Sequence, residues 1–270
     1  MDWVTVGNAG NAADTTGYGA VSYAYQIGKY EVTNAQYGAF LNAAAKTDSY
    51  GLYNSNMSSF GITRSGSSGS YTYSVTTALA NRPVVYVSWF DAARFANWMV
   101  NGQGSGSAET GAYTLNGATS GIILANAGAQ VYIPTEDEWY KAAYYNSASQ
   151  TYSLYPNGQN SITTADANYE YSVGSSTDVG TYSSNPSSYG SFDQGGNVWE
   201  LNDAVIGSSR GLRGGSWRNY DYTLASSDRN DLDPSFEDDG FGFRLASVPE
   251  PSSLVLSVLA SGVVLLRRKR

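Results

Sequence analysis

Hydrophobic and polar residues alternate in short bursts at the start of the chain, and glycines separate these bursts. An alternation with a period of two is typical of strands that bury one face. We therefore expect early strands within residues 3–32. The apolar positions that carry the pattern are Val4, Val6, Val21, Tyr23, Tyr25 and Ile27.

The first helix is predicted directly after these strands. Thr33 and Gln36 have the spacing of a capping box, and apolar residues follow at i, i+3, i+4 and i+7. The pattern predicts a helix from about Asn34 to Ala45.

Two further capped helices are predicted, each after a short apolar strand. The strand at residues 82–87 leads into Ser88, an N-cap with an acid at N3, and Gly102 ends the helix that follows. The strand at 131–134 leads into Thr135, with three acids in the next turn. We interpret those acids as capping and as favourable charges at the helix N-terminus.

The segments between these elements are rich in Gly, Ser, Asn and Tyr. Residues 47–80 are expected to form loops with an irregular hairpin, residues 113–124 a second hairpin, and residues 146–191 mostly loops. The 30 glycines among 270 residues agree with a loop-rich fold.

The composition then limits which catalytic, metal-binding and partner-binding functions are possible. The chain has no cysteine and no histidine, which excludes disulfides, thiolate and imidazole metal sites, and catalysis by either side chain. A bound metal would have to be a hard cation held by oxygen atoms, and calcium is the first candidate. The acidic pI, near 4.5, argues against nucleic acid as a partner.

The C-terminal segment differs from the rest of the chain. Residues 252–266 carry no charge and are followed directly by RRKR. Without residues 250–270 the chain has 11 basic and 22 acidic side chains, a net charge of -11. We divide the chain into a domain at residues 1–247 and a sorting or membrane segment at 248–270; the alternative for the apolar run is a buried C-terminal helix.

The order of Pro-Glu-Pro, a short apolar run and a basic cluster resembles the PEP-CTERM sorting signal. The matching residues are Pro249, Glu250, Pro251, Arg267, Arg268, Lys269 and Arg270. The resemblance implies export to the cell envelope or surface, anchoring in the membrane at least transiently, and an exosortase-type enzyme as partner. Residues 1–23 lack the pattern of a signal peptide, so we expect a misassigned start or a truncated chain.

Six motifs of the body resemble, in order, the formylglycine-generating enzyme (sulfatase-modifying factor) family. They are KYEVTNAQYGAFL, RPVVYVSWFDAARFANWM, YIPTEDEWYKAA, GGNVWELND, LRGGSW and GFRLA. The resemblance implies an irregular, loop-rich α+β fold related to that of C-type lectins. Independently of the family, Arg213 and Arg244 are expected to satisfy several carbonyls each, and Trp199 and Trp217 to be buried.

The family also implies calcium sites. The positions that match its first set of ligands are Asp193, the carbonyls of Gly196 and Val198, and Glu200. A second, less complete site matches Asn168 and Tyr169. The alternatives for the first set are that Glu200 pairs with an arginine and Asp193 caps a turn.

The chain departs from the family at its catalytic centre. Active members carry two cysteines after the GGS motif, and Asn219 and Leu224 occupy these positions here. Neither side chain is a soft ligand for copper(I), and the histidines that hold iron in related enzymes are absent, so we expect neither copper nor iron.

The leading hypothesis is therefore a non-catalytic binding or structural module, exported to the cell surface or to exopolysaccharide, with a glycan or a peptide as ligand. Two alternatives remain open, an enzyme of this superfamily acting through an unrecognised oxygen-ligand site and a purely architectural role. Six acids lie within residues 228–239, a segment that we interpret as a solvated acidic loop or one more calcium-stabilised turn rather than a catalytic carboxylate pair.

Overall fold

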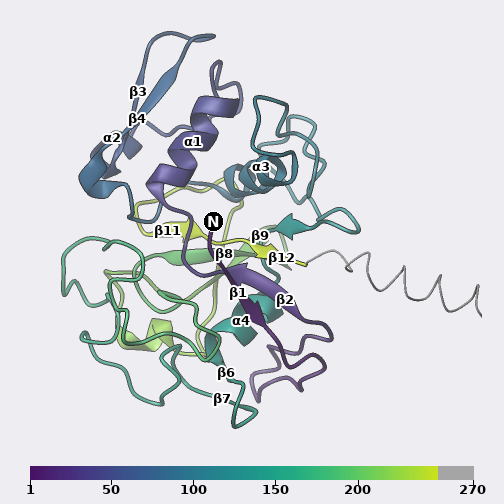
Figure 1. Ribbon diagram of the computed structural model, residues 1–270, viewed down its shortest axis with the longest axis vertical. Coiled ribbons are helices and arrows are strands. Elements are labelled where there is room, and N and C mark those ends of the chain that lie inside the picture. The colour runs from purple at the N-terminus through teal and green to yellow at the C-terminus, as the bar shows by residue number, and fades with distance from the viewer. Residues whose placement is uncertain (249–270) are drawn as a thin grey trace, which may run out of the picture.

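Two small sheets and three capped helices organise this loop-rich α+β chain in a computed structural model that describes residues 1–248 (Figure 1). The first sheet has the order β1-β2-β12-β5 and the second β10-β9-β8-β11. Two hairpins, β3-β4 and β6-β7, complete the strands of the described part. The strands are β1 (Trp3–Val6), β2 (Tyr25–Gly28), β3 (Ile62–Ser65), β4 (Thr72–Val75), β5 (Val131–Tyr132), β6 (Tyr145–Asn146), β7 (Thr151–Tyr152), β8 (Trp199–Ile206), β9 (Ser209–Arg213), β10 (Asn230–Leu232), β11 (Phe241–Phe243) and β12 (Ala246–Ser247).

The helices cover these sheets and begin where the sequence places their caps. They are α1 (Asn34–Ala44), α2 (Met57–Phe60), α3 (Trp89–Val100) and α4 (Glu136–Tyr144), with 3-10 turns η1 (Thr77–Leu79) and η2 (Asp221–Leu224). Complete capping boxes start α1, α3 and α4, as predicted. None of the helices within residues 1–248 has the length and apolar character needed to cross a membrane.

The two ends of the described chain meet in the first sheet. β12 pairs antiparallel with β2, with Ala246 opposite Ile27, and also with β5. β1 and β2 confirm the early strands, although Val21 and Tyr23 lie in the turn before β2. The second sheet contains one parallel pair, β11 with β8, beside two antiparallel ones.

Two predicted elements are wrong or incomplete. Residues 82–87 form no strand, because Tyr86 has a left-handed backbone (φ 58°) that breaks the extended run, although the apolar residues around it are buried. The hairpin expected at 113–124 is reduced to a single bridge between Tyr113 and Ala125. The hairpin expected within 47–80 is present as β3 and β4.

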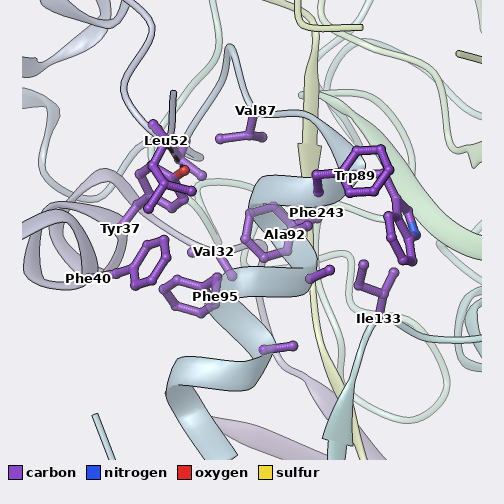
Figure 2. Packing of buried hydrophobic residues seen from close by; sticks show 14 of the residues in the cluster. Val32, Tyr37, Phe40, Leu52, Val87, Trp89, Ala92, Phe95, Ile133 and Phe243 are labelled. Atoms are coloured by element: carbon purple, nitrogen blue, oxygen red, sulfur yellow. Dashed lines mark hydrogen bonds between the residues drawn. The ribbon is translucent and has the colours of Figure 1, made fainter. Parts of the chain in front are cut away.

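An aromatic core joins α1, α3 and the second sheet. Phe95 on α3 packs edge-on against Phe40 of α1 and Phe243 of β11, with ring centroids 5.5 Å apart in both pairs. Figure 2 shows these rings together with Trp89 and Tyr37. All five are almost fully buried, so aromatic packing takes the place of long regular elements.

Buried arginines satisfy carbonyls in this irregular backbone, as predicted. Arg213 donates to the carbonyls of Ser226 and Asp228. Arg244 donates to Gly28 at 2.9 Å and to Phe192 at 2.8 Å. Each guanidinium thereby connects loops that lie far apart in the sequence.

The buried cap of α3 predicts a dependence of stability on pH. Asp91 is 2 % exposed, and its pKa is raised from 3.8 to about 7, mainly by burial and further by Glu237, while Ser88 donates to it and lowers it. Because the folded pKa lies above the unfolded one, the free energy of unfolding should fall as the pH rises from about 4 to about 7 and level off above that. Asp91→Asn, which keeps a capping oxygen, should flatten this fall in urea titrations at about pH 5 and about pH 7. Asp231→Asn, at an exposed acid, is the matched control and should keep the parent slope.

Candidate functional site

The GGS turn follows β9 and packs closely against η2. Gly214 and Gly215 both have left-handed backbones, with φ of 97° and 71°. A Cβ on Gly215 would lie 2.4 Å from Thr223 Oγ1 and 2.7 Å from Leu224 Cδ1. Only glycine therefore allows the turn and η2 to approach this closely.

Asn219, which the resemblance matches to the first cysteine of the family, is a structural brace. Its carbonyl oxygen Oδ1 accepts hydrogen bonds from Trp199 Nε1 at 2.9 Å, from Ser216 N at 3.0 Å and from Ser216 Oγ at 2.6 Å. These bonds hold the GGS turn closed and fix the indole of β8. The side chain stabilises the turn rather than presenting a free reactive group.

Leu224, which the resemblance matches to the second cysteine, belongs to the hydrophobic core. It is completely buried in a cluster with Tyr155, Ala167, Tyr169 and Ala225. The apolar surroundings agree with leucine and would disfavour a charged thiolate. The two positions thus carry a turn brace and a core side chain.

Two pairs of aromatic rings lie in and beside this turn, and together we name them the aromatic platform. They are Tyr171, Trp217, Tyr220 and Tyr222. The three tyrosines are 58 %, 54 % and 63 % exposed, and Trp217 is half-buried, contrary to its predicted burial. Trp199, by contrast, is buried as expected.

Backbone hydrogen bonds and ring contacts hold the platform together. Glu170 and Tyr171 both have φ of 55°, and their N–H groups donate to the carbonyls of Asn219 at 2.7 Å and Trp217 at 2.8 Å. The rings of Tyr171 and Trp217 meet edge-on at 5.5 Å, while Tyr220 and Tyr222 stack at 6.4 Å. Two successive non-glycine residues in the left-handed region are uncommon and point to a constrained, functional surface.

Charged groups border the platform on one side. Arg218 lies over the Trp217 ring at 5.8 Å and forms ion pairs with Asp238 and, at 2.6 Å, with Asp239. The acidic segment 228–239 is therefore partly paired, which corrects its interpretation as a solvated loop. Glu237 accepts from Asn54 at 2.6 Å, whereas Asp238 and Asp239 share Arg218.

Glu200, the acidic ligand of the predicted calcium site, forms an ion pair. Arg244 donates to its two oxygens at 2.5 and 2.6 Å, and Trp139 Nε1 adds a bond of 2.7 Å. Both charged side chains are completely buried. Of the two alternatives for Glu200, the pairing with an arginine is the geometry present.

The remaining predicted calcium positions lie close together. A Cβ on Gly196 would be 2.3 Å from the carbonyl oxygen of Asn168, so the two expected sites adjoin, and the Val198 side chain is buried beside them. Asp193 accepts from Gly180 N at 2.6 Å, and burial raises its pKa from 3.8 to about 6. The side-chain oxygen of Asn168 is buried without a partner. Tyr169 directs its hydroxyl to the carbonyl of Ile162 at 3.2 Å.

Glu31 belongs to the same network and was not recognised in the sequence. It is 1 % exposed, one oxygen accepts from Asn197 at 3.1 Å, and the other has no partner. Its pKa is raised mainly by burial and then by Asp193, while Arg244 lowers it. Its only signal in the sequence is its place next to Val32 in KYEVTN, shortly before the first helix.

The side-chain oxygens of this network are partly suited to bind a hard cation. Glu31, Asp193 and Glu200 face one arginine, and two buried oxygens lack partners. Such oxygens and surplus negative charge suit calcium. The Glu200 carboxylate is already taken by Arg244, however, and within residues 1–248 no group of three or more acidic side chains has the arrangement of a metal centre.

Comparison with known proteins agrees with this fold and places the chain in a family. The sulfatase-modifying factor enzyme 1-like domain matches residues 7–248, so the chain belongs to that family. Hercynine oxygenase of Mycobacterium tuberculosis (strain ATCC 25618 / H37Rv) is 26 % identical over 252 residues, which cover 83 % of this chain. The match covers 52 % of that enzyme, so the chain spans about half the length of this relative.

Three solved structures share the architecture. CarF has a TM-score of 0.65 at 23 % identity and is covered over 99 % of its length by 93 % of this chain. The Treponema denticola variable protein 1 has a TM-score of 0.64 at 23 % identity, with 92 % of this chain and 95 % of that one covered. PvdO from Pseudomonas aeruginosa has a TM-score of 0.54 at 16 % identity, with coverages of 92 % and 94 %. These matches establish the fold class.

The brace at Asn219 predicts a clear ranking of substitutions. All three bonds end on its oxygen, so Asn219→Asp should keep them near neutral pH and fold like the parent. Asn219→Leu should leave the Trp199 and Ser216 donors without their partner and lower the free energy of unfolding by about 2–4 kcal/mol. Urea unfolding followed by tryptophan fluorescence measures both effects. Equal stability of the two variants would contradict the bracing role.

Proposed function

We propose that this chain is a non-catalytic member of its family that binds a glycan on the aromatic platform. The observation that carries the proposal is the set of four rings, three of them more than half exposed, fixed on a braced turn. Exposed aromatic faces on a rigid support offer large contact area with little loss of side-chain entropy. The apolar faces of sugar rings are suited to stack on such surfaces.

The chemistry at the former cysteine positions supports the non-catalytic part of the proposal. The oxygen of Asn219 accepts three hydrogen bonds, and Leu224 is inside the core. Neither provides the thiolate that copper chemistry in the family needs. The second candidate, a retained enzymatic activity, rests on the resemblance to hercynine oxygenase, which shares 26 % identity.

The location proposed for this module is the cell envelope. Residues 249–270, which contain the Pro249-Glu250-Pro251 motif and the Arg267–Arg270 cluster, lie outside the described residues. Their resemblance to a sorting signal supports export, contact with the membrane and processing by an exosortase-type partner. At this location the bound glycan would belong to the cell surface or to exopolysaccharide.

A glycan array on the full chain tests the binding function. We expect at least one glycan to bind, with affinity reduced about tenfold or more in Tyr171→Ala and in Tyr222→Ala. Tyr50→Ala is the matched control, because Tyr50 is a 39 % exposed ring outside the platform. Binding only to peptides, or glycan binding unchanged in both platform variants, would refute this site. Oxidation of a cysteine peptide in the presence of copper above the buffer rate would refute the non-catalytic assignment.

Calcium is proposed as a structural ion in the network of Glu31, Asp193 and Asn168. Its orphan oxygens and surplus charge support this role, and binding would stabilise only the folded chain. The melting temperature should therefore be a few degrees higher in calcium than in chelator. Asp193→Asn should abolish the difference while leaving the buried Glu200 pair intact. Asp231→Asn is the charge-matched control, and no calcium effect in the parent removes the proposal.

A further inference from the structure

A cavity of about 480 Å³ lies beside β5, at the edge of the first sheet. It shares no lining residue with the aromatic platform. Its volume is in the range of sites for small organic molecules. The side chains that carry the argument are Tyr23, Tyr132 and Asp203.

The two tyrosines are held in place by one buried carboxylate. Glu138 Oε1 accepts from the hydroxyl of Tyr23 at 2.9 Å and from that of Tyr132 at 2.6 Å. Its other oxygen, Oε2, accepts from Thr135 N at 2.8 Å and closes the capping box of α4. The rings are therefore fixed before any ligand arrives, which lowers the entropy lost on binding.

The carboxylates around this cavity outnumber the cations. Glu138 is completely buried, and it takes part in none of the ion pairs found in the described part of the chain. Asp203 contributes a second carboxylate, which pairs with Arg210 at 2.7 Å and whose pKa burial raises to about 7. The described residues that line the cavity include no lysine or arginine. Phosphates and carboxylates are disfavoured there, and positive charge is favoured.

Aromatic walls and nearby negative charge define a class of ligand. A phenol that donates to a carboxylate keeps high electron density in its ring, and ring faces attract cations. Tyr23 remains protonated at neutral pH, because burial and then Glu138 raise its pKa to about 12. The ring of Tyr23 is 42 % exposed and forms the accessible rim.

From this arrangement we propose that the cavity binds a small organic cation, an alkylammonium group with an apolar body. The ammonium group lies over the faces of Tyr23 and Tyr132, within the field of Glu138 and Asp203. Such a site is independent of glycan binding on the platform. It would provide a second, charge-selective ligand site on the same domain.

Choline and 3,3-dimethylbutan-1-ol, its neutral isostere, test this proposal on the full chain by titration calorimetry. The two probes have nearly the same shape, so a difference in affinity reports charge. We expect choline to bind at least about tenfold more tightly than the isostere. Equal affinities, or no choline binding at millimolar concentrations, would overturn the proposal.

Two variants locate the binding. Tyr23→Leu, at the exposed rim, should weaken choline about fivefold to tenfold while changing the isostere little. Glu138→Gln, which keeps the capping-box pattern, should reduce the preference for choline by removing the buried charge. Tyr50→Leu, at a ring 39 % exposed elsewhere on the surface, should bind choline like the parent. Undiminished choline binding in Tyr23→Leu would place the ligand elsewhere and refute this site.

Discussion

The buried ion pair between Arg244 and Glu200 is the interaction on which the rest of the domain depends. Both side chains are fully removed from water, and a buried charge is tolerated only when it is paired and hydrogen-bonded. Arg244 also holds the carbonyls of Gly28 and Phe192, and Glu200 holds the indole of Trp139. One pair therefore connects β2, β8, α4 and the loop before β8. Removal of either partner leaves an uncompensated buried charge, which typically costs about 3–5 kcal/mol.

A chain with short strands and many loops needs such contacts because its backbone forms few regular ladders. Arg94, Arg210 and Arg213 are also almost fully buried, and each lies near a carboxylate and an aromatic ring. Planar guanidinium groups can satisfy several carbonyls and stack on rings at once. Together with the aromatic core these side chains give order to a domain that has no disulfide.

The same framework supports the turn beside which the platform lies. β8 carries Trp199, and Asn219 holds its indole, so Asn219 is part of the support for the GGS turn. Three of the platform rings are exposed, and Trp217 is half-buried. Tyr171 also has a left-handed backbone, and an exposed ring on strained backbone agrees with the binding surface proposed above.

Several features could be predicted because they depend on neighbouring residues only. The capping boxes at Thr33, Ser88 and Thr135 involve side chains three residues apart, and all three helices begin there. The prediction of a strand at 82–87 was wrong because the backbone of Tyr86 is left-handed. This conformation goes with contacts distant in the sequence, including the hydrogen bond from the N–H of Tyr86 to the carbonyl of Asp238. Apolar periodicity cannot show such a turn, since tertiary contacts decide it.

The sequence by itself determined the fold class through six motifs in order, the helix starts, and the absence of thiol and imidazole chemistry. Only the tertiary structure decided which acids form ion pairs and which are buried without one. Glu138 was interpreted as a cap, yet the fold also places it behind two tyrosines 6 and 115 residues away in the chain. Glu31 meets Asn197 across 166 residues. The sequence shows which side chains can carry a charge. The electrostatic free energy of each charge depends on its burial and on partners that only folding brings together.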